Sequence, residues 1–233
     1  MWHPQIDNLI ANKYRVIAPD LRGFGESHNF ADINAIDDMA EDIAELLTAL
    51  KVERAIFVGL SMGGYVLLNL FSSIPEKFAA IILCSTTAEA DSDKKREYRL
   101  HLIEKIEKNG VQILIEEMLP SLISDFTKQA KPDLIKQIEQ MFSEVKPKAA
   151  IAALHGMAER KSLTHLLPDI SIPTSLIFGN NDQITTDKVA EQLNLQIKKS
   201  KLSFIENAAH YSNIEQPQLF NKILVDFINE VVI

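Results

Sequence analysis

The sequence has little of several features that mark particular classes of protein. Cys84 is its only cysteine, which excludes a scaffold built on disulfides. No apolar run approaches the length of about 18 residues that suggests a membrane span, and residues 1–5 lack the basic and apolar regions of a signal peptide. No basic block is present, and a net charge of −8 argues against nucleic acid or anionic membranes as partners. We therefore expect a cytoplasmic protein that binds neither.

Sequence signatures of nucleotide and metal sites are also missing. No Gly-x-Gly-x-x-Gly follows a predicted strand, and Gly-Lys is nowhere followed by Ser or Thr. The six histidines do not show a spacing typical of zinc sites. Cys84 lies inside an apolar run, where a buried thiol is usually inert. We expect no cofactor and no metal ion.

Short apolar runs alternate with helical patterns over much of the chain. Its 233 residues, 46% of them apolar, suffice for one large domain with a sizeable core. Strands that are apolar on both faces and alternate with helices indicate a parallel sheet covered on both sides, the α/β class. The predicted strands are residues 14–20, 55–58, 80–84, 174–178 and 201–205, and the clearest helices are residues 40–50, 64–71 and 217–231.

Residues 88–169 have a different character. They carry many charges, no convincing strand, and helical patterns at residues 100–106, 111–119, 134–142 and 149–157, punctuated by Pro120, Pro132, Pro147 and Pro168. We expect a helical insertion that divides the core into residues 1–87 and 170–233. It is either a solvated surface bundle or a lid over an active site.

The main chemical motif is Gly59-Leu60-Ser61-Met62-Gly63-Gly64, between a predicted strand and a predicted helix. This is the context of a nucleophile elbow, where the serine occupies a tight, strained turn. We expect a side chain at Gly59 or Gly63 to collide with the neighbouring strand or helix. The backbone N–H of Met62, at the start of the helix, is placed to stabilise an oxyanion. The alternative is a glycine-rich turn that only lets the helix pack closely.

A nucleophilic serine needs a base. Of the four histidines downstream of Ser61, the insertion contains His101, His155 and His165. His210 instead follows the predicted strand at residues 201–205, where such sheets place catalytic loops. Taken alone, His210 reads more readily as a structural histidine; together with Ser61 it is the favoured base.

The base needs an acid to orient it. Asp182 follows the predicted strand at residues 174–178 and is the favoured acid. Its structural alternative is to cap the helix that begins near Thr186 or to accept hydrogen bonds within its own turn. The rivals are Glu206, close in sequence to His210, and Asp91, which follows the preceding strand.

Glycines gather just after predicted strands. Six of the eight do so, as expected for a catalytic face built from strand-end loops. Gly23 and Gly25 belong to the loop at residues 20–27, for which we expect positive φ angles. That loop is either structural, the favoured interpretation, or lines the pocket.

Three motifs together resemble the α/β-hydrolase family: residues 19–27, residues 59–64 and residues 208–217. The chain is most similar to small bacterial esterases and 3-oxoadipate enol-lactonases. The resemblance implies Ser61 as nucleophile, Asp182 as acid and His210 as base, with residues 88–169 as a helical cap and no cofactor. It implies a serine hydrolase of small ester or lactone substrates, as a monomer or homodimer.

The resemblance fails at the start of the chain. Family members carry an earlier strand that ends in a His-Gly loop and supplies a second oxyanion N–H, whereas residues 1–6 resemble the helix after that loop. An incomplete start is the expectation; a rearranged sheet and a strand donated by a partner are the alternatives. The missing donor also motivates a second function, a catalytically impaired protein that binds a ligand or partner. Acyl transfer and C–C bond hydrolysis on the same triad stay open.

Overall fold

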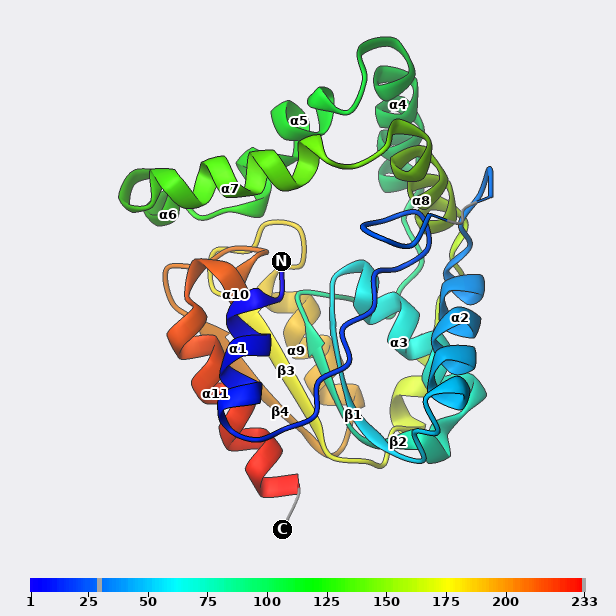
Figure 1. The fold of residues 1–233 in the computed structure, drawn as a ribbon, viewed down its shortest axis with the longest axis vertical. Helices are drawn as coiled ribbons and strands as arrows, with labels where there is room; N and C mark the ends of the chain where they lie inside the picture. The colour runs from blue at the N-terminus through cyan, green and yellow to red at the C-terminus, as the bar shows by residue number, and fades with distance from the viewer. Residues whose placement is uncertain (29–30, 232–233) are drawn as a thin grey trace.

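The computed structural model describes residues 1–28 and 31–231, and its centre is a four-stranded sheet (Figure 1). The strands are β1 (Ala55–Leu60), β2 (Phe78–Cys84), β3 (Thr174–Gly179) and β4 (Ser200–Ile205). They lie in the order β1-β2-β3-β4, and every neighbouring pair is parallel. The expected α/β class is confirmed, and four of the five predicted strands are present.

Helices cover both faces of this sheet. One face packs against α2 (Ile36–Ala49), α3 (Met62–Ser73) and α9 (Asp187–Gln196), and the other against α1 (His3–Ala11) and α11 (Pro217–Val231) (Figure 1). Side chains of β2 alternate between the two faces: Ile81 and Leu83 join the first cluster, and Ile82 and Cys84 join the second. None of these four is exposed. This explains why the strand reads as a continuous apolar run.

The predicted strand at residues 14–20 is wrong. The segment has no regular secondary structure and is mostly exposed, with Ile17 38% exposed. A strand needs a neighbouring strand to complete its backbone hydrogen bonds, and within the described residues none lies beside this segment. The sheet is not rearranged to compensate. Instead β1 forms one of its edges, and in the described part of the chain its only partner is β2.

Residues 88–169 are helical, as predicted. They form α4 (Asp93–Asn109), α5 (Gln112–Leu122), α6 (Asp125–Ala130), α7 (Pro132–Ser143) and α8 (Pro147–Glu159), followed by the 3₁₀ helix η2 (Thr164–Asp169). Pro132 and Pro147 stand in first turns, whereas Pro120 lies inside α5. α4 packs on α8 around a small apolar core of its own. This insertion extends beyond the carboxyl ends of the strands (Figure 1).

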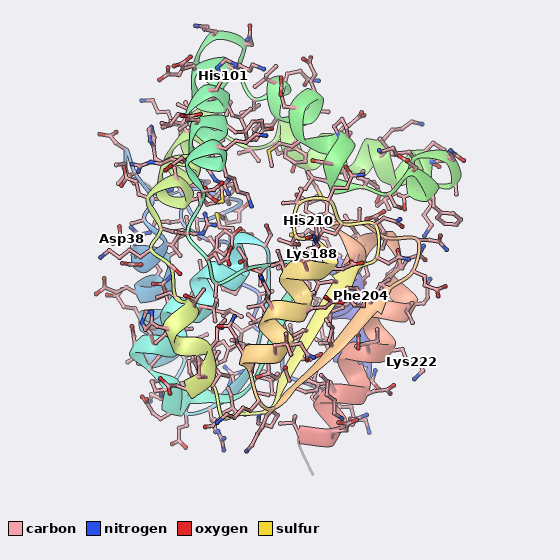
Figure 2. The ribbon with its side chains drawn as sticks, turned by 180° about the vertical axis from the view of Figure 1, so that it is seen from behind. Asp38, His101, Lys188, Phe204, His210 and Lys222 are labelled. Carbon is pink, nitrogen blue, oxygen red and sulfur yellow. The ribbon has the colours of Figure 1, made fainter. Side chains whose placement is uncertain are left out.

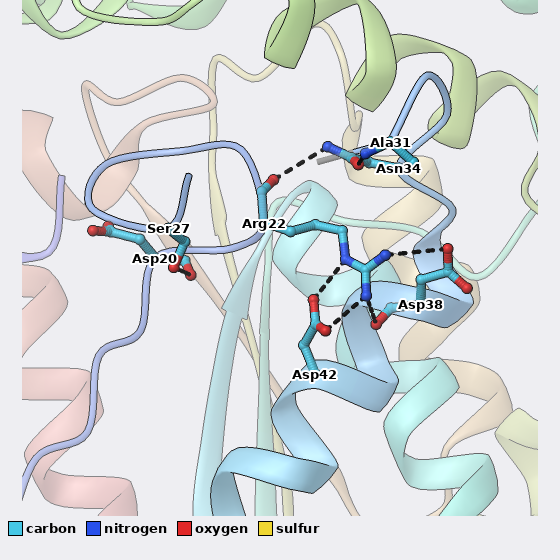
Figure 3. A network of polar contacts seen from close by, with 7 residues as sticks. All are labelled: Asp20, Arg22, Ser27, Ala31, Asn34, Asp38 and Asp42. Carbon is cyan, nitrogen blue, oxygen red and sulfur yellow. Dashed lines mark hydrogen bonds and ion pairs between the residues drawn. The ribbon is translucent and has the colours of Figure 1, made fainter. Parts of the chain in front are cut away.

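The loop at residues 20–27 is fixed by its own contacts. Gly23 and Gly25 have φ angles of 87° and 49°, as predicted, and a Cβ on Gly25 would lie 2.1 Å from a carboxylate oxygen of Asp20. Arg22 donates from Nε and Nη2 to the two carboxylate oxygens of Asp42 on α2, over 2.6 and 2.7 Å (Figure 3). These contacts favour the structural interpretation of the loop.

In the described residues, no helix is both long enough and apolar enough to cross a membrane.

Candidate active site

Ser61 occupies the strained turn that its motif predicts. It stands between β1 and α3 with φ 53° and ψ −114°, a conformation rarely adopted by residues other than glycine. Its backbone N–H donates to the carbonyl of Cys84 over 2.9 Å, and its carbonyl accepts from Thr86 Oγ1 over 2.8 Å. Such strain costs about 1–3 kcal/mol and persists only where the surroundings impose it. One bond comes from the last residue of β2 and the other from the segment just after it, and together they hold the turn in place.

The glycines of this motif have unequal roles. A Cβ on Gly59 would lie 2.6 Å from the carbonyl oxygen of Gly63, as predicted. The prediction for Gly63 is wrong, because nothing lies within 4 Å of the position that its Cβ would occupy. The close approach falls on Gly64, whose Cβ would lie 2.3 Å from Thr86 Oγ1. The helix thus packs against the end of β2 through Gly64.

Met62 begins α3, and its backbone N–H therefore has no acceptor within the helix. The partial positive charge of the helix N-terminus adds to that of this N–H. An oxyanion formed beside Ser61 would find a donor there.

Asp182 and His210 are in contact and buried. His210 Nδ1 lies 2.8 Å from Asp182 Oδ2, and the two residues are 2% and 5% exposed, respectively. The other oxygen, Oδ1, accepts from the backbone N–H groups of Ile184 and Thr185 over 2.8 and 3.0 Å. Thr185 Oγ1 donates to Oδ2 over 2.6 Å. Four donors therefore fix the carboxylate, with the imidazole on one side of it.

The environment of Asp182 favours its ionised form. Burial alone would raise its pKa, but the hydrogen bond and charge of His210 and the hydrogen bonds from Thr185 outweigh burial and lower the pKa below its usual value. An ionised Asp182 holds the proton of His210 on Nδ1, which leaves Nε2 free to accept another proton.

In the described residues neither rival acid pairs with His210. Asp91 pairs with Arg99 Nε at 2.5 Å and with Arg160 Nη1 at 2.8 Å, and its side chain is fully buried. Glu206 is exposed. Of the other downstream histidines, His101 and His165 are exposed and His155 is half-buried in α8. Of these four histidines, only His210 contacts a carboxylate that follows a strand in the described structure.

The loop that carries His210 turns back across the end of β3. Asn181 N–H donates to the carbonyl of Ala208 over 2.9 Å, and a Cβ on Gly179 would lie 2.1 Å from the carbonyl oxygen of Ala209. His210 thereby lies above the strands and below the helical insertion (Figure 2). Ser61 also lies at the carboxyl end of the strands, and no hydrogen bond joins it to His210 in the described part of the chain.

Thr185 is the site residue that the sequence analysis missed. Its signal is local: a threonine three residues after an aspartate in a loop is typical of a turn in which the carboxylate accepts from the backbone. Thr185 also lines a hollow of about 350 Å³ together with Lys95 and Arg160, among others. Neither Ser61 nor His210 lines that hollow.

Two further kinds of group bear on the chemistry of the chain: the thiol of Cys84 and the side chains that bind metal ions. Burial raises the pKa of the Cys84 thiol far above its ordinary value, so the thiol stays protonated and unreactive. Among residues 1–28 and 31–231, no three His, Cys, Asp or Glu side chains gather closely enough to hold a metal ion.

Comparisons with known proteins match the fold described above. A family model described as the alpha/beta hydrolase fold matches residues 1–217. The chain is 29% identical to 3-oxoadipate enol-lactonase 1 of Acinetobacter baylyi, over 99% of this chain and 84% of that protein. A thermophilic esterase from Thermogutta terrifontis, solved with malate bound, superposes with a TM-score of 0.95 at 35% identity, over 99% of this chain and 85% of that one. For the enol-lactonase from Burkholderia xenovorans LB400 the TM-score is 0.88 at 26% identity, over 98% and 85%.

Proposed function

This chain is a member of the alpha/beta hydrolase fold family, and on that premise we propose that it is a serine hydrolase that cleaves carboxylic esters or lactones. The observation that carries the proposal is the buried contact between His210 and Asp182, at the carboxyl end of the strands, where the strained turn of Ser61 also lies. The proposed nucleophile Ser61 follows β1, the proposed acid Asp182 follows β3, and the proposed base His210 follows β4. Their order along the chain is therefore Ser, Asp, His, as in this fold.

The proposed reaction proceeds in two halves through an acyl-enzyme. Ser61 Oγ attacks the substrate carbonyl carbon while His210 Nε2 takes the hydroxyl proton, and the N–H of Met62 stabilises the oxyanion. His210 then gives the proton to the leaving alkoxide, and the C–O bond breaks. Water attacks the acyl-enzyme with the same base, which releases the acid and restores Ser61. Throughout, Asp182 holds the imidazole and stabilises its protonated form.

An ester or lactone carbonyl is the proposed substrate because the relatives named above are esterases and enol-lactonases. In this proposal, residues 88–169 form the cap that covers the substrate and selects it. Met118 and Leu119 of the insertion are only partly buried, and they pack on the same apolar cluster as Tyr211, the residue after His210. A small and fairly apolar acyl or alcohol group suits such a surface.

A second candidate is a protein that keeps the triad residues but binds a ligand without turnover. The observation that favours it is the edge position of β1, since the turn of Ser61 continues a strand with one strand partner in the described residues. The two candidates differ in the reactivity of Ser61.

Hydrolysis of p-nitrophenyl acetate and butyrate tests the proposal, together with labelling by a fluorophosphonate. We expect turnover and labelling of the unaltered chain, and Ser61→Ala should lose labelling and all but a trace of turnover. Ser73→Ala changes an exposed serine at the far end of α3 and is the matched control. Turnover of Ser61→Ala at the unaltered rate would refute the mechanism. Saturable ester binding without labelling of Ser61 would favour the second candidate.

A further inference from the structure

Glu215 is a fully buried carboxylate that the proposed mechanism does not use. It ends α10 (Ser212–Glu215), five residues after His210, and is 0% exposed. Its Oε1 accepts from the backbone N–H of Ala209 over 2.7 Å. Its Oε2 accepts from the N–H and the hydroxyl of Ser124 over 2.8 and 2.7 Å. One carboxylate therefore joins two segments that lie more than 80 residues apart in the sequence.

These two segments are the histidine loop and the helical insertion. Ala209 directly precedes His210, and Ser124 is the N-cap of α6. The residue after His210 is held as well, because Tyr211 N–H donates to the carbonyl of Leu122 in α5 over 3.2 Å. The backbone on both sides of His210 is thus tied to the insertion, once through Glu215 and once directly.

The chemistry of Glu215 points to this joining role. A buried carboxylate is costly unless hydrogen bonds compensate for the lost hydration. In the described residues no ion pair involves the Glu215 carboxylate, and the nearby ammonium of Lys131 binds the backbone carbonyl of Glu215 instead, so three hydrogen-bond donors supply that compensation. Ile214 packs beside it against Leu122, Ile123 and Ile138 of the insertion. Apolar side chains already hold the two segments together. The carboxylate also fixes their relative position, because it accepts directional hydrogen bonds from both Ala209 and Ser124.

We propose that Glu215 is a positioning residue that fixes the loop of His210 to the helical insertion, so that the base and the cap keep one relative position. The proposal rests on the proposed function in one respect, that His210 is the base. A shift of the insertion at Ser124 is then transmitted to His210 through hydrogen bonds, without any contact between Ser124 and the imidazole.

Glu215→Gln is the first test, because it keeps the size of the side chain. One of its two ends becomes an amide NH₂, which faces the N–H of Ala209 or of Ser124 instead of accepting from it. We expect kcat for p-nitrophenyl butyrate to fall by about tenfold or more, with KM changed less than threefold. Glu206→Gln, an exposed glutamate close to the same loop, is the matched control and should leave both values unchanged.

Ser124→Ala tests the side of the insertion and is the milder variant, because the N–H of residue 124 still reaches Glu215. We expect kcat to fall about threefold. In the double variant Ser124→Ala/Glu215→Gln, kcat should be little lower than in Glu215→Gln alone, since both changes act through one contact. If Ser124 only docks the cap over the substrate, KM rises, kcat is retained and the proposal is wrong.

Proton NMR of His210 separates this proposal from the proposed function, since it needs no substrate. The Nδ1–H between His210 and Asp182 should give a far-downfield resonance that disappears in His210→Gln. We expect Glu215→Gln and Ser124→Ala to shift or broaden it, and Glu206→Gln to leave it unchanged. A shifted resonance in a chain that hydrolyses no ester would overturn the function and retain the positioning role. An unchanged resonance with unchanged kcat in both variants would overturn the positioning role alone.

Discussion

Two buried carboxylates follow neighbouring strands of the sheet, Asp91 after β2 and Asp182 after β3. Both side chains are 0% exposed, and each lies within 3 Å of cationic or imidazole nitrogens. For both, burial alone would raise the pKa, and the partners outweigh burial and lower it. The sequence alone makes both of them candidates for the acid that orients His210.

Their partners distinguish them. Asp91 is held between the guanidinium groups of Arg99 and Arg160, which donate hydrogen bonds and cannot accept them. Asp182 is held by the imidazole of His210, a group that can accept a proton, and by fixed donors from its own turn. An arginine pair locks a carboxylate in place, whereas a histidine pair lets the carboxylate stabilise a charge that appears during a reaction. Both carboxylates follow a strand, so their position does not distinguish them; the residues that pair with each carboxylate do.

Asp182→Asn should have the largest effect in this comparison. An amide keeps the shape of the side chain but no longer favours the proton on Nδ1 of His210 or stabilises the imidazolium. We expect kcat/KM for p-nitrophenyl esters to fall by about 10³- to 10⁴-fold, by analogy with other serine hydrolases. Circular dichroism should show an unchanged fold. Retention of more than a tenth of the activity would contradict the role of Asp182.

Asp91→Asn should act on stability instead. Removing one member of a buried ion pair leaves Arg99 and Arg160 without compensation, and we expect the free energy of unfolding to fall by about 3–5 kcal/mol. Urea denaturation measures this loss, and kcat of the folded fraction should change less than threefold. The control is Asp93→Asn, two residues away and exposed.

The effect of Asp91→Asn should also depend on pH. Because the folded-state pKa of Asp91 is lowered, its contribution to stability is complete above the unfolded pKa of about 3.9 and is lost as the pH falls through the folded value. The stability difference between the unaltered chain and Asp91→Asn should therefore narrow below about pH 4. A difference that stayed constant down to pH 2.5 would mean that Asp91 does not act through its charge.

Thr185→Val should have the smallest effect and sharpens the comparison. It removes the Oγ1 hydrogen bond to Asp182 while keeping the volume of the side chain and the N–H bond to Oδ1. We expect about a tenfold loss in kcat/KM and a rise in the pKa of Asp182, since Thr185 helps to lower it. The acid limb of the pH–rate profile should move to higher pH. Thr185→Ser restores the hydroxyl and should recover most of the loss.

Local features were predictable from the sequence, and contacts between distant segments were not. The turn of Ser61 and the strands at β2 and β3 depend on adjacent glycines and on runs that are apolar on both faces. The segment at residues 14–20 contains the short apolar run Val16-Ile17-Ala18 and forms no strand, because a strand also requires a neighbour that its own residues do not supply. Likewise, no pattern near Asp91 reveals that Arg160, 69 residues away, reaches its carboxylate.

β1 is the strand that leads into Ser61, and in the described residues it is hydrogen-bonded to a strand on one side only. Local opening costs least where fewest bonds must break, so the outer strands β1 and β4 belong to the low-stability end of this sheet, while β2 and β3, each with a partner on both sides, belong to the high end. The proposed nucleophile and the proposed base therefore follow outer strands, whereas the proposed acid follows an inner strand. On gradual heating, the turn of Ser61 and the loop of His210 would lose their geometry before the turn of Asp182 does.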